Sequence, residues 1–124
     1  MRKWVVLSIG LLIACSGAPA GDPAKRIESY LQARVQGDVN RMIALSCADW
    51  EASARLEATS IQGRSPALEG LACRADELEG GTVFVACAGR IITSYDGERR
   101  EFDLAERQFK LVAEAGEWRM CGYR

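Results

Sequence analysis

The chain has 124 residues, enough for one domain, and a formal net charge of -1. Without a basic excess, nucleic acid is not expected as a partner. The chain contains no histidine. This excludes histidine general-base catalysis, nucleophiles paired with histidine, and most zinc or iron sites. We therefore expect no metal and no cofactor, and the sequence identifies no catalytic residue.

The N-terminus has the features of an export signal. A basic start, Met1-Arg2-Lys3, precedes an apolar run over 4–13, which is too short to cross a bilayer and is typical of a signal peptide. The residues that follow, Leu12-Ile13-Ala14-Cys15, resemble a bacterial lipobox. That resemblance implies removal of residues 1–14 as a lipoprotein signal peptide. It also implies acylation of Cys15, with residues 15–21 as a lipidated tether.

Lipidation of Cys15 predicts an exported protein whose first partner is the membrane itself, because two or three acyl chains anchor a protein stably. Ser16 follows the cysteine in place of a retention aspartate. In a bacterium with two membranes this implies the outer membrane, facing the periplasm or the cell surface; otherwise it implies the outer face of the cytoplasmic membrane. The alternative is ordinary secretion, with cleavage at Ala18-Pro19-Ala20.

The first half of the mature chain is predicted to be helical, because apolar residues recur at helical spacing. Asp22-Pro23 is typical of a helix start, and Gly37 of its end. Asp38 is expected to cap a second helix.

A third helix is expected after Asp49, which would be its cap. Its apolar stripe is thin: Trp50 faces inward, followed by either Leu56 or Glu57.

Beyond a loop over 62–66, alternation of apolar and polar residues predicts strands. They are expected over 68–78, 82–95, 98–112 and 117–123, with an irregularity in the third at 103–105. The turns between them are Glu79-Gly80-Gly81, Asp96-Gly97 and Ala115-Gly116. Helices first and an antiparallel meander second indicate an α+β domain over 22–124.

Strand registers follow from counting back from the turns. The turn at Asp96-Gly97 sets Phe84 opposite Phe109. The turn at Ala115-Gly116 sets Met120 opposite Leu111 and Trp118 opposite Ala113. These registers predict one sheet face that packs on the helices, made of Phe84, Ala86, Phe109, Leu111, Trp118 and Met120.

With Cys15 assigned to lipid, an even set of cysteines remains, and in an oxidising compartment this indicates disulfide bonds. A three-residue loop at 79–81 would put Cys73 opposite Cys87, leaving Cys47 for Cys121. The competing set pairs Cys47 with Cys73 and Cys87 with Cys121. The predicted register turns Cys121 away from the helices. A Cys47–Cys121 bond therefore needs a β-bulge, or a helix end that wraps round the sheet edge.

Four stretches resemble small bacterial lipoproteins of the NTF2-like (cystatin-like, SnoaL-type) superfamily: Tyr30-Leu31, Gly37-Asp38, Leu45 to Trp50, and Gly116 to Tyr123. The resemblance implies a curved four-stranded sheet wrapped around N-terminal helices, forming a cone with a pocket at its wide end. It implies no specific activity, because this fold hosts both enzymes and non-catalytic binders. The pocket candidates are Tyr30, Trp50, Phe84, Phe109 and Trp118.

The leading hypothesis is a lipid-anchored, non-catalytic domain that binds a small ligand or an envelope protein. One alternative is an isomerase or dehydratase of the ketosteroid-isomerase type, with an Asp base in the cone beside Tyr30. Another is a structural envelope protein that forms a homodimer through its sheet.

Overall fold

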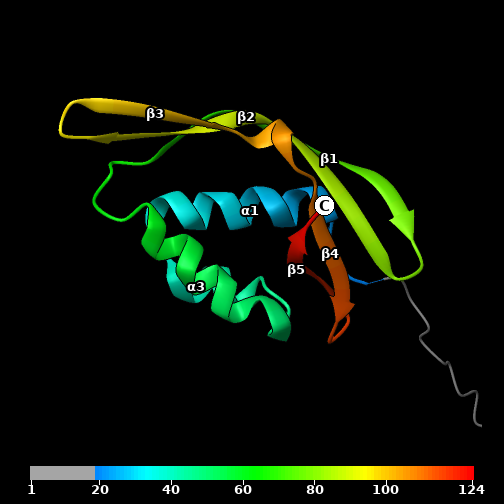
Figure 1. Ribbon diagram of the computed structural model, residues 1–124. Helices are drawn as coiled ribbons and strands as arrows, with labels where there is room; N and C mark the ends of the chain where they lie inside the picture. Colours follow the sequence, from blue (N-terminus) through cyan, green and yellow to red (C-terminus); the bar gives the residue numbers. More distant parts are fainter. Residues whose placement is uncertain (1–18) are drawn as a thin grey trace, which may run out of the picture.

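The computed structural model describes residues 19–124. The predicted signal peptide, the lipobox and Cys15 lie outside the described residues. The described part is an α+β domain in which helices pack against one antiparallel sheet, as predicted (Figure 1). No helix in this part of the chain is long and apolar enough to cross a membrane.

The helices begin and end largely where local chemistry predicts. Asp22 accepts a hydrogen bond from Ala24 N at 2.9 Å, and Gly37 closes the first helix with a φ of 70°. Asp38 caps the second helix through Arg41 N at 3.1 Å. The helical elements are α1 (Pro23–Gln36), α2 (Val39–Ala44), the 3₁₀ turn η1 (Ala48–Trp50) and α3 (Glu51–Ser60).

The prediction that Asp49 caps the third helix is wrong. Asp49 is exposed within η1, which precedes α3, and its side chain makes no capping bond. Both carboxylate oxygens of Glu114, at the far end of the sheet, instead accept from Ala48 N at 3.2 and 3.3 Å. The cap therefore comes from a residue distant in sequence.

The sheet has five strands in the described chain, one more than predicted, because the expected third strand is divided in two. A 3₁₀ turn at Leu104–Glu106 separates its halves, beside the irregularity predicted at 103–105. Both halves pair with β2, one after the other along the same edge. The elements are β1 (Ala67–Glu79), β2 (Thr82–Tyr95), β3 (Glu98–Asp103), η2 (Leu104–Glu106), β4 (Phe109–Glu114) and β5 (Glu117–Tyr123).

The 3₁₀ turn also corrects one predicted register. Phe84 lies opposite Lys110, and Val85 lies opposite Phe109. The register counted back from the turn at 96–97 is correct along β3, but beyond η2 the observed pairs differ from it by one residue. A shift of one residue in the register turns every side chain to the other face of the sheet. Phe84 therefore faces away from the helices, with the Arg124 guanidinium 3.6 Å from its ring centroid.

The remaining registers are confirmed: Leu111 pairs with Met120, and Ala113 with Trp118. All of these except Ala113 are buried. The inward sheet face consequently consists of Val83, Val85, Cys87, Phe109, Leu111, Trp118 and Met120. It packs on Ile27, Tyr30 and Leu31 of α1, all of them fully buried.

The β2–β3 hairpin reaches past the C-terminal end of α1 (Figure 1), and every residue of β3 is exposed. The ribbon of β1 and β2 bends where Gly70 meets Gly89. A Cβ atom on Gly89 would lie 2.5 Å from Glu69 O and 2.7 Å from Gly70 C. The close approach of the two strands at this bend therefore depends on glycine at position 89.

The free edge of β5 is covered by the link between α2 and η1. Cys47 N donates to Met120 O, and Met120 N donates to Leu45 O, both at 2.8 Å. Ala20 N adds a bond to Gly116 O at 2.7 Å near the start of the strand. The end of α2 thus wraps round the sheet edge, one of the two arrangements that a Cys47–Cys121 bond requires.

Two disulfide bonds are present, Cys47–Cys121 and Cys73–Cys87, and they are the pairs that the sequence favoured. Cys73 lies directly opposite Cys87, although the turn has two residues rather than three; an irregularity between Ala75 and Glu77 restores the register. Two disulfide bonds suggest an oxidising, extracytoplasmic environment.

Candidate ligand pocket

A cavity of about 200 Å³ lies between the C-terminal ends of α1 and α3 and the 3₁₀ turn η2. Half of its ten lining residues are apolar: Ile61, Ile91, Phe102, Leu104 and Phe109. The other half are polar: Arg34, Asp103, Glu106, Arg107 and Tyr123. Apolar side chains beside polar groups that can fix a ligand's orientation are a feature of small-molecule sites.

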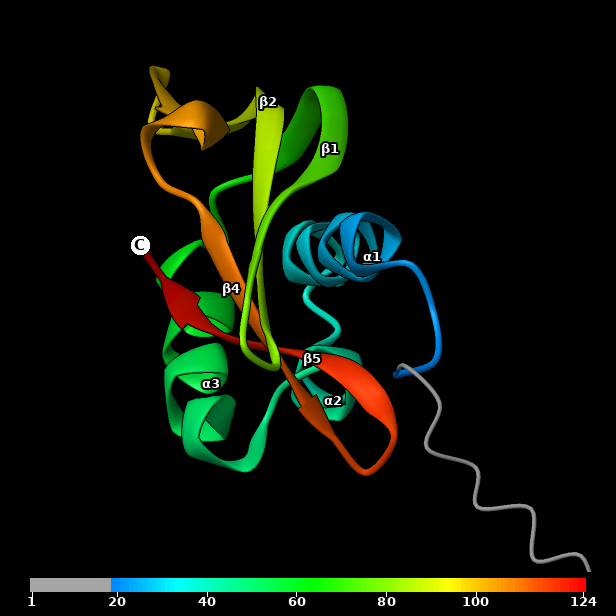
Figure 2. The same cartoon turned by 90° about the vertical axis from the view of Figure 1, so that its right-hand side faces the viewer.

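Beside this cavity, Glu57 of α3 joins α1 to β5. Tyr30 is fully buried, and its hydroxyl donates to Glu57 Oε1 at 2.5 Å. The hydroxyl of Tyr123, which lines the cavity, donates to the other carboxylate oxygen, Oε2. At the C-terminus of the chain, β5 ends beside α3 (Figure 2), and this brings Tyr123 to Glu57. Three elements that are distant in sequence are therefore fixed by one carboxylate.

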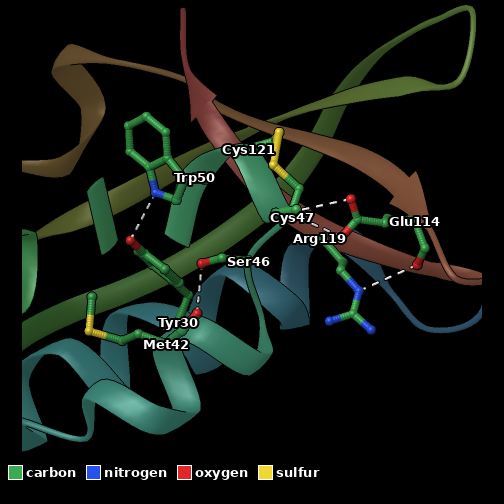
Figure 3. The surroundings of a disulfide bond; sticks show 9 residues. Tyr30, Met42, Ser46, Cys47, Trp50, Glu114, Arg119 and Cys121 are labelled. Carbon is green, nitrogen blue, oxygen red and sulfur yellow. Dashed lines mark hydrogen bonds between the residues drawn. A yellow bond between two sulfur atoms is a disulfide. The ribbon is translucent and has the colours of Figure 1, made fainter. Parts of the chain in front are cut away.

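Two aromatic contacts support this arrangement. Trp50 Nε1 donates to the Tyr30 hydroxyl at 3.1 Å (Figure 3). The Trp50 ring meets that of Tyr123 edge to face, with centroids 5.5 Å apart. The Cys47–Cys121 bond, also drawn in Figure 3, ties together the segments from which these two rings come.

Burial raises the pKa of Tyr30 and of Tyr123 well above its usual value, and the negative charge of Glu57 adds to the effect. Both phenols remain protonated at neutral pH and act as hydrogen-bond donors. Glu57 therefore holds two phenols and also pairs with Arg34, whose Nη1 lies 3.3 Å from Glu57 Oε2. A carboxylate engaged in this way is poorly placed to act as a general base.

Two arginines line the same cavity. The Arg34 side chain is 17% exposed, and its Nε is buried without a hydrogen-bond partner among the described residues. The Arg107 guanidinium lies over the Tyr123 ring, 4.0 Å from its centroid.

The predicted pocket residues are divided among several places. Phe109 lines the cavity, whereas Tyr30 and Trp50 belong to the hydrogen-bonded group around Glu57. Trp118 is buried in the core. Phe84 lies on the opposite sheet face for the register reason given above.

Sequence reasoning missed Arg34 and Tyr123 as cavity residues. One signal pointed to the group beside the cavity, namely the choice between Leu56 and Glu57 as the inward residue of the third helix. The structure selects Glu57, since Leu56 is 71% exposed.

A larger hollow of about 660 Å³ lies on the sheet, where Glu69, Glu101, Asp103 and Glu106 surround Arg90. It is open, and Arg90 is already bonded to Glu69 at 3.0 and 3.1 Å. No group of acidic or cysteine side chains in the described chain is arranged to hold a metal ion. We therefore regard the smaller cavity, which combines apolar side chains with the mostly buried Arg34, as the candidate site.

The arrangement of the elements resembles that in solved structures. An NTF2-like protein with a cystatin-like fold from Novosphingobium aromaticivorans matches with a TM-score of 0.55 and 16% identity, over 80% of this chain and 75% of that one. The fold is NTF2-like. Aln2 from a Streptomyces species matches this NTF2-like domain with a TM-score of 0.54 and 17% identity, over 80% and 82% of the two chains.

A SEC-C motif containing protein from Rhodopseudomonas palustris also matches, with a TM-score of 0.57 and 10% identity, over 83% of this chain and 77% of that one. At such identities the likeness concerns the fold alone. No protein-family model and no curated protein matches the sequence.

Proposed function

We propose that the chain is an exported, lipid-anchored NTF2-like domain that binds a small molecule in the cavity beside Tyr123 without converting it chemically. The observation that carries this proposal is a small cavity lined by both apolar and polar side chains, next to a carboxylate that is already engaged. Glu57, the acid beside Tyr30, is held by two phenols and Arg34. The carboxylate that lies against Tyr30 is thus committed to holding the helices and β5 together.

The size of the cavity limits its occupant. Drug-sized ligands occupy about 300–1,000 Å³, and a dry cavity of about 150 Å³ can hold benzene. A cavity of about 200 Å³ fits a molecule with one ring and one small polar group.

A titration followed by NMR tests the binding function. Small one-ring compounds should shift the methyl signals of Ile91 and Leu104, which line the cavity. An Ile61→Trp variant should abolish these shifts by filling the cavity. Leu56→Trp, on the exposed side of α3, is the matched control and should leave them unchanged. Binding that persists in the Ile61 variant contradicts the proposal.

The anchoring part of the proposal rests on the lipobox pattern and agrees with the presence of disulfide bonds. Replacing Cys15 by Ser should release the protein from the membrane fraction into the soluble one. Equal membrane association of the two forms would contradict the anchor.

The isomerase alternative has one observation in its favour, namely that Asp103 lines the cavity. Its carboxylate, however, accepts from Ala105 N at 2.9 Å and so caps η2. If Asp103 is a catalytic base, a ligand found by the titration will be converted on incubation, and Asp103→Asn will stop the conversion. An unchanged ligand spectrum supports simple binding.

A further inference from the structure

Two cationic side chains at the cavity, those of Arg34 and Arg107, keep N–H donors that no hydrogen bond within the described residues uses. The two oxygens of Glu57 already accept from Tyr30 and Tyr123. The guanidinium of Arg34, by contrast, makes one ion pair and no hydrogen bond among the described residues, and its Nε is buried without a partner. A buried polar atom in this state calls for a ligand or water that would satisfy it.

Arg107 also lines the cavity, but it is exposed. Its guanidinium stacks on the Tyr123 ring. Stacking uses the face of the guanidinium and leaves the N–H groups at its edge available. Two guanidinium groups with unused N–H donors therefore line one small cavity.

From this accounting we infer that the cavity binds a small organic anion, with a compact apolar body and a single carboxylate. The inference rests on the proposed function and specifies its ligand. The carboxylate would accept from Arg34 and Arg107, since planar N–H donors match carboxylate geometry and charge-assisted hydrogen bonds are the stronger kind. The apolar body would lie against Ile91, Leu104 and Phe109.

The two acids at the cavity do not reverse this preference. Asp103 and Glu106 are exposed, and both also line the open hollow on the sheet. Solvent therefore reaches them, as it reaches the exposed Arg107, and the charges of all three are screened by water and salt. Arg34 is mostly buried, where electrostatic interactions are stronger.

Glu57 gives the buried arginine a fixed position. Its carboxylate balances the charge of Arg34 and is itself fixed by two phenols. A guanidinium that is held before the ligand arrives loses less conformational entropy on binding.

The test compares three probes of similar shape: benzoate, benzyl alcohol and benzylamine. Each is titrated into the full chain at constant pH and salt, and the signals of the cavity residues are followed by NMR. We expect benzoate to bind about tenfold more tightly than benzyl alcohol, the effect of one charge-assisted hydrogen bond. Benzylamine, a cation, should bind most weakly.

Variants identify the groups involved. Arg107→Gln should weaken benzoate about tenfold and leave benzyl alcohol unchanged, because an exposed arginine is lost without damage to the fold. Arg34→Lys should also weaken benzoate, since it keeps a charge for Glu57 but removes the planar donors. Arg55→Gln, an exposed arginine on α3, is the matched control and should have no effect.

The outcomes separate the inference from the proposed function. If benzyl alcohol or benzylamine binds in the cavity as tightly as benzoate, or if Arg107→Gln has no effect on benzoate, the anion preference is overturned while small-molecule binding stands. If none of the three probes shifts the cavity signals, both proposals fall.

Discussion

One of the two disulfide bonds joins strands that already pair, and the other joins segments that are distant in sequence. Cys73–Cys87 joins directly opposed residues of two paired strands, only 14 residues apart in the chain. Cys47–Cys121 joins residues 74 apart. It closes the β5 corner, by which we mean the link over 45–47 together with β5. The first bond reinforces strands that already pair, whereas the second fixes segments that the meander itself leaves unconnected.

The β5 corner is also where polar side chains cross between helices and sheet. Arg119 donates to Ala44 O at 2.6 Å, at the end of α2. Glu114, drawn in Figure 3, caps η1. The ribbon of β1 and β2 has one such contact, since Glu28 Oε1 of α1 accepts from Cys73 N at 3.2 Å, and it otherwise depends on backbone pairing and on the close approach at Gly89. We conclude that the corner organises the cavity and that the ribbon mainly extends the sheet.

The largest expected effect is the loss of the corner disulfide. In the chain-entropy model, replacing both Cys47 and Cys121 by Ala should lower the free energy of unfolding by about 4 kcal/mol. Denaturant unfolding followed by circular dichroism measures this. Hydrogen exchange should also become faster in α3 and β5. A loss below about 1 kcal/mol would show that the hydrogen bonds of the corner suffice without the bond.

Replacing Cys73 and Cys87 by Ala should cost about 3 kcal/mol, because the bond closes a shorter loop. Ligand binding in the cavity should be unaffected, since neither residue lines it. The same unfolding measurement, combined with the benzoate titration, checks both statements. If the variant that lacks Cys73–Cys87 loses benzoate binding while the variant that lacks Cys47–Cys121 keeps it, the ribbon and not the β5 corner organises the cavity.

The bend of the ribbon predicts a third effect. Gly89→Ala should cost at least about 2 kcal/mol, because the new Cβ meets the backbone of β1. Gly97→Ala is a control for positive φ alone: its φ is 75°, an added Cβ would have no other atom within 4 Å, and the change should cost about 1 kcal/mol. Equal losses in thermal or denaturant unfolding would mean that the close approach is unimportant.

The smallest effect is a pH dependence at the corner. Burial and Glu57 raise the pKa of Tyr30 and Tyr123 in the folded protein above the unfolded value of about 10. The contribution of these protonated phenols to the free energy of unfolding is therefore complete below about pH 10, the unfolded pKa, and is lost as the pH rises further. The free energy of unfolding should fall with a slope approaching about 1.4 kcal/mol per pH unit for each tyrosine.

Urea unfolding at several pH values from about 8 to 11, which span the unfolded pKa of tyrosine, measures this slope. Tyr123→Phe, which removes one of the two phenols, should reduce it by about half. A free energy that stays constant across the range would contradict the buried, protonated state of these phenols.

Local chemistry allowed much of the fold to be predicted. The caps Asp22 and Asp38 and the turn at Asp96-Gly97 depend on neighbouring residues, and they are found as expected. The register of Phe84 could not be predicted in this way. It depends on the number of residues that a 3₁₀ turn absorbs between β3 and β4, and nothing in the alternating pattern specifies that number.

The candidate site was less predictable than the fold. Tyr30, Glu57 and Tyr123 come from three distant parts of the chain, and only the folded sheet brings them together. A glutamate within a thin apolar stripe is a weak sign of burial, because an exposed glutamate gives the same pattern. The disulfide pairs were easier to predict, since covalent geometry permits few combinations.

The cavity lies near the C-terminal end of α1, and the predicted tether leads to the other end of this helix. The helix begins at Pro23, just after Ala20 pairs beside β5, and Arg34 of the cavity lies near its other end. Fourteen residues of α-helix are about 21 Å long. In the lipid-anchored form, a tether of only a few residues would hold the start of α1 close to the bilayer. If the anchor exists as proposed, the cavity would lie near the far end of α1, up to one helix length from the lipid surface.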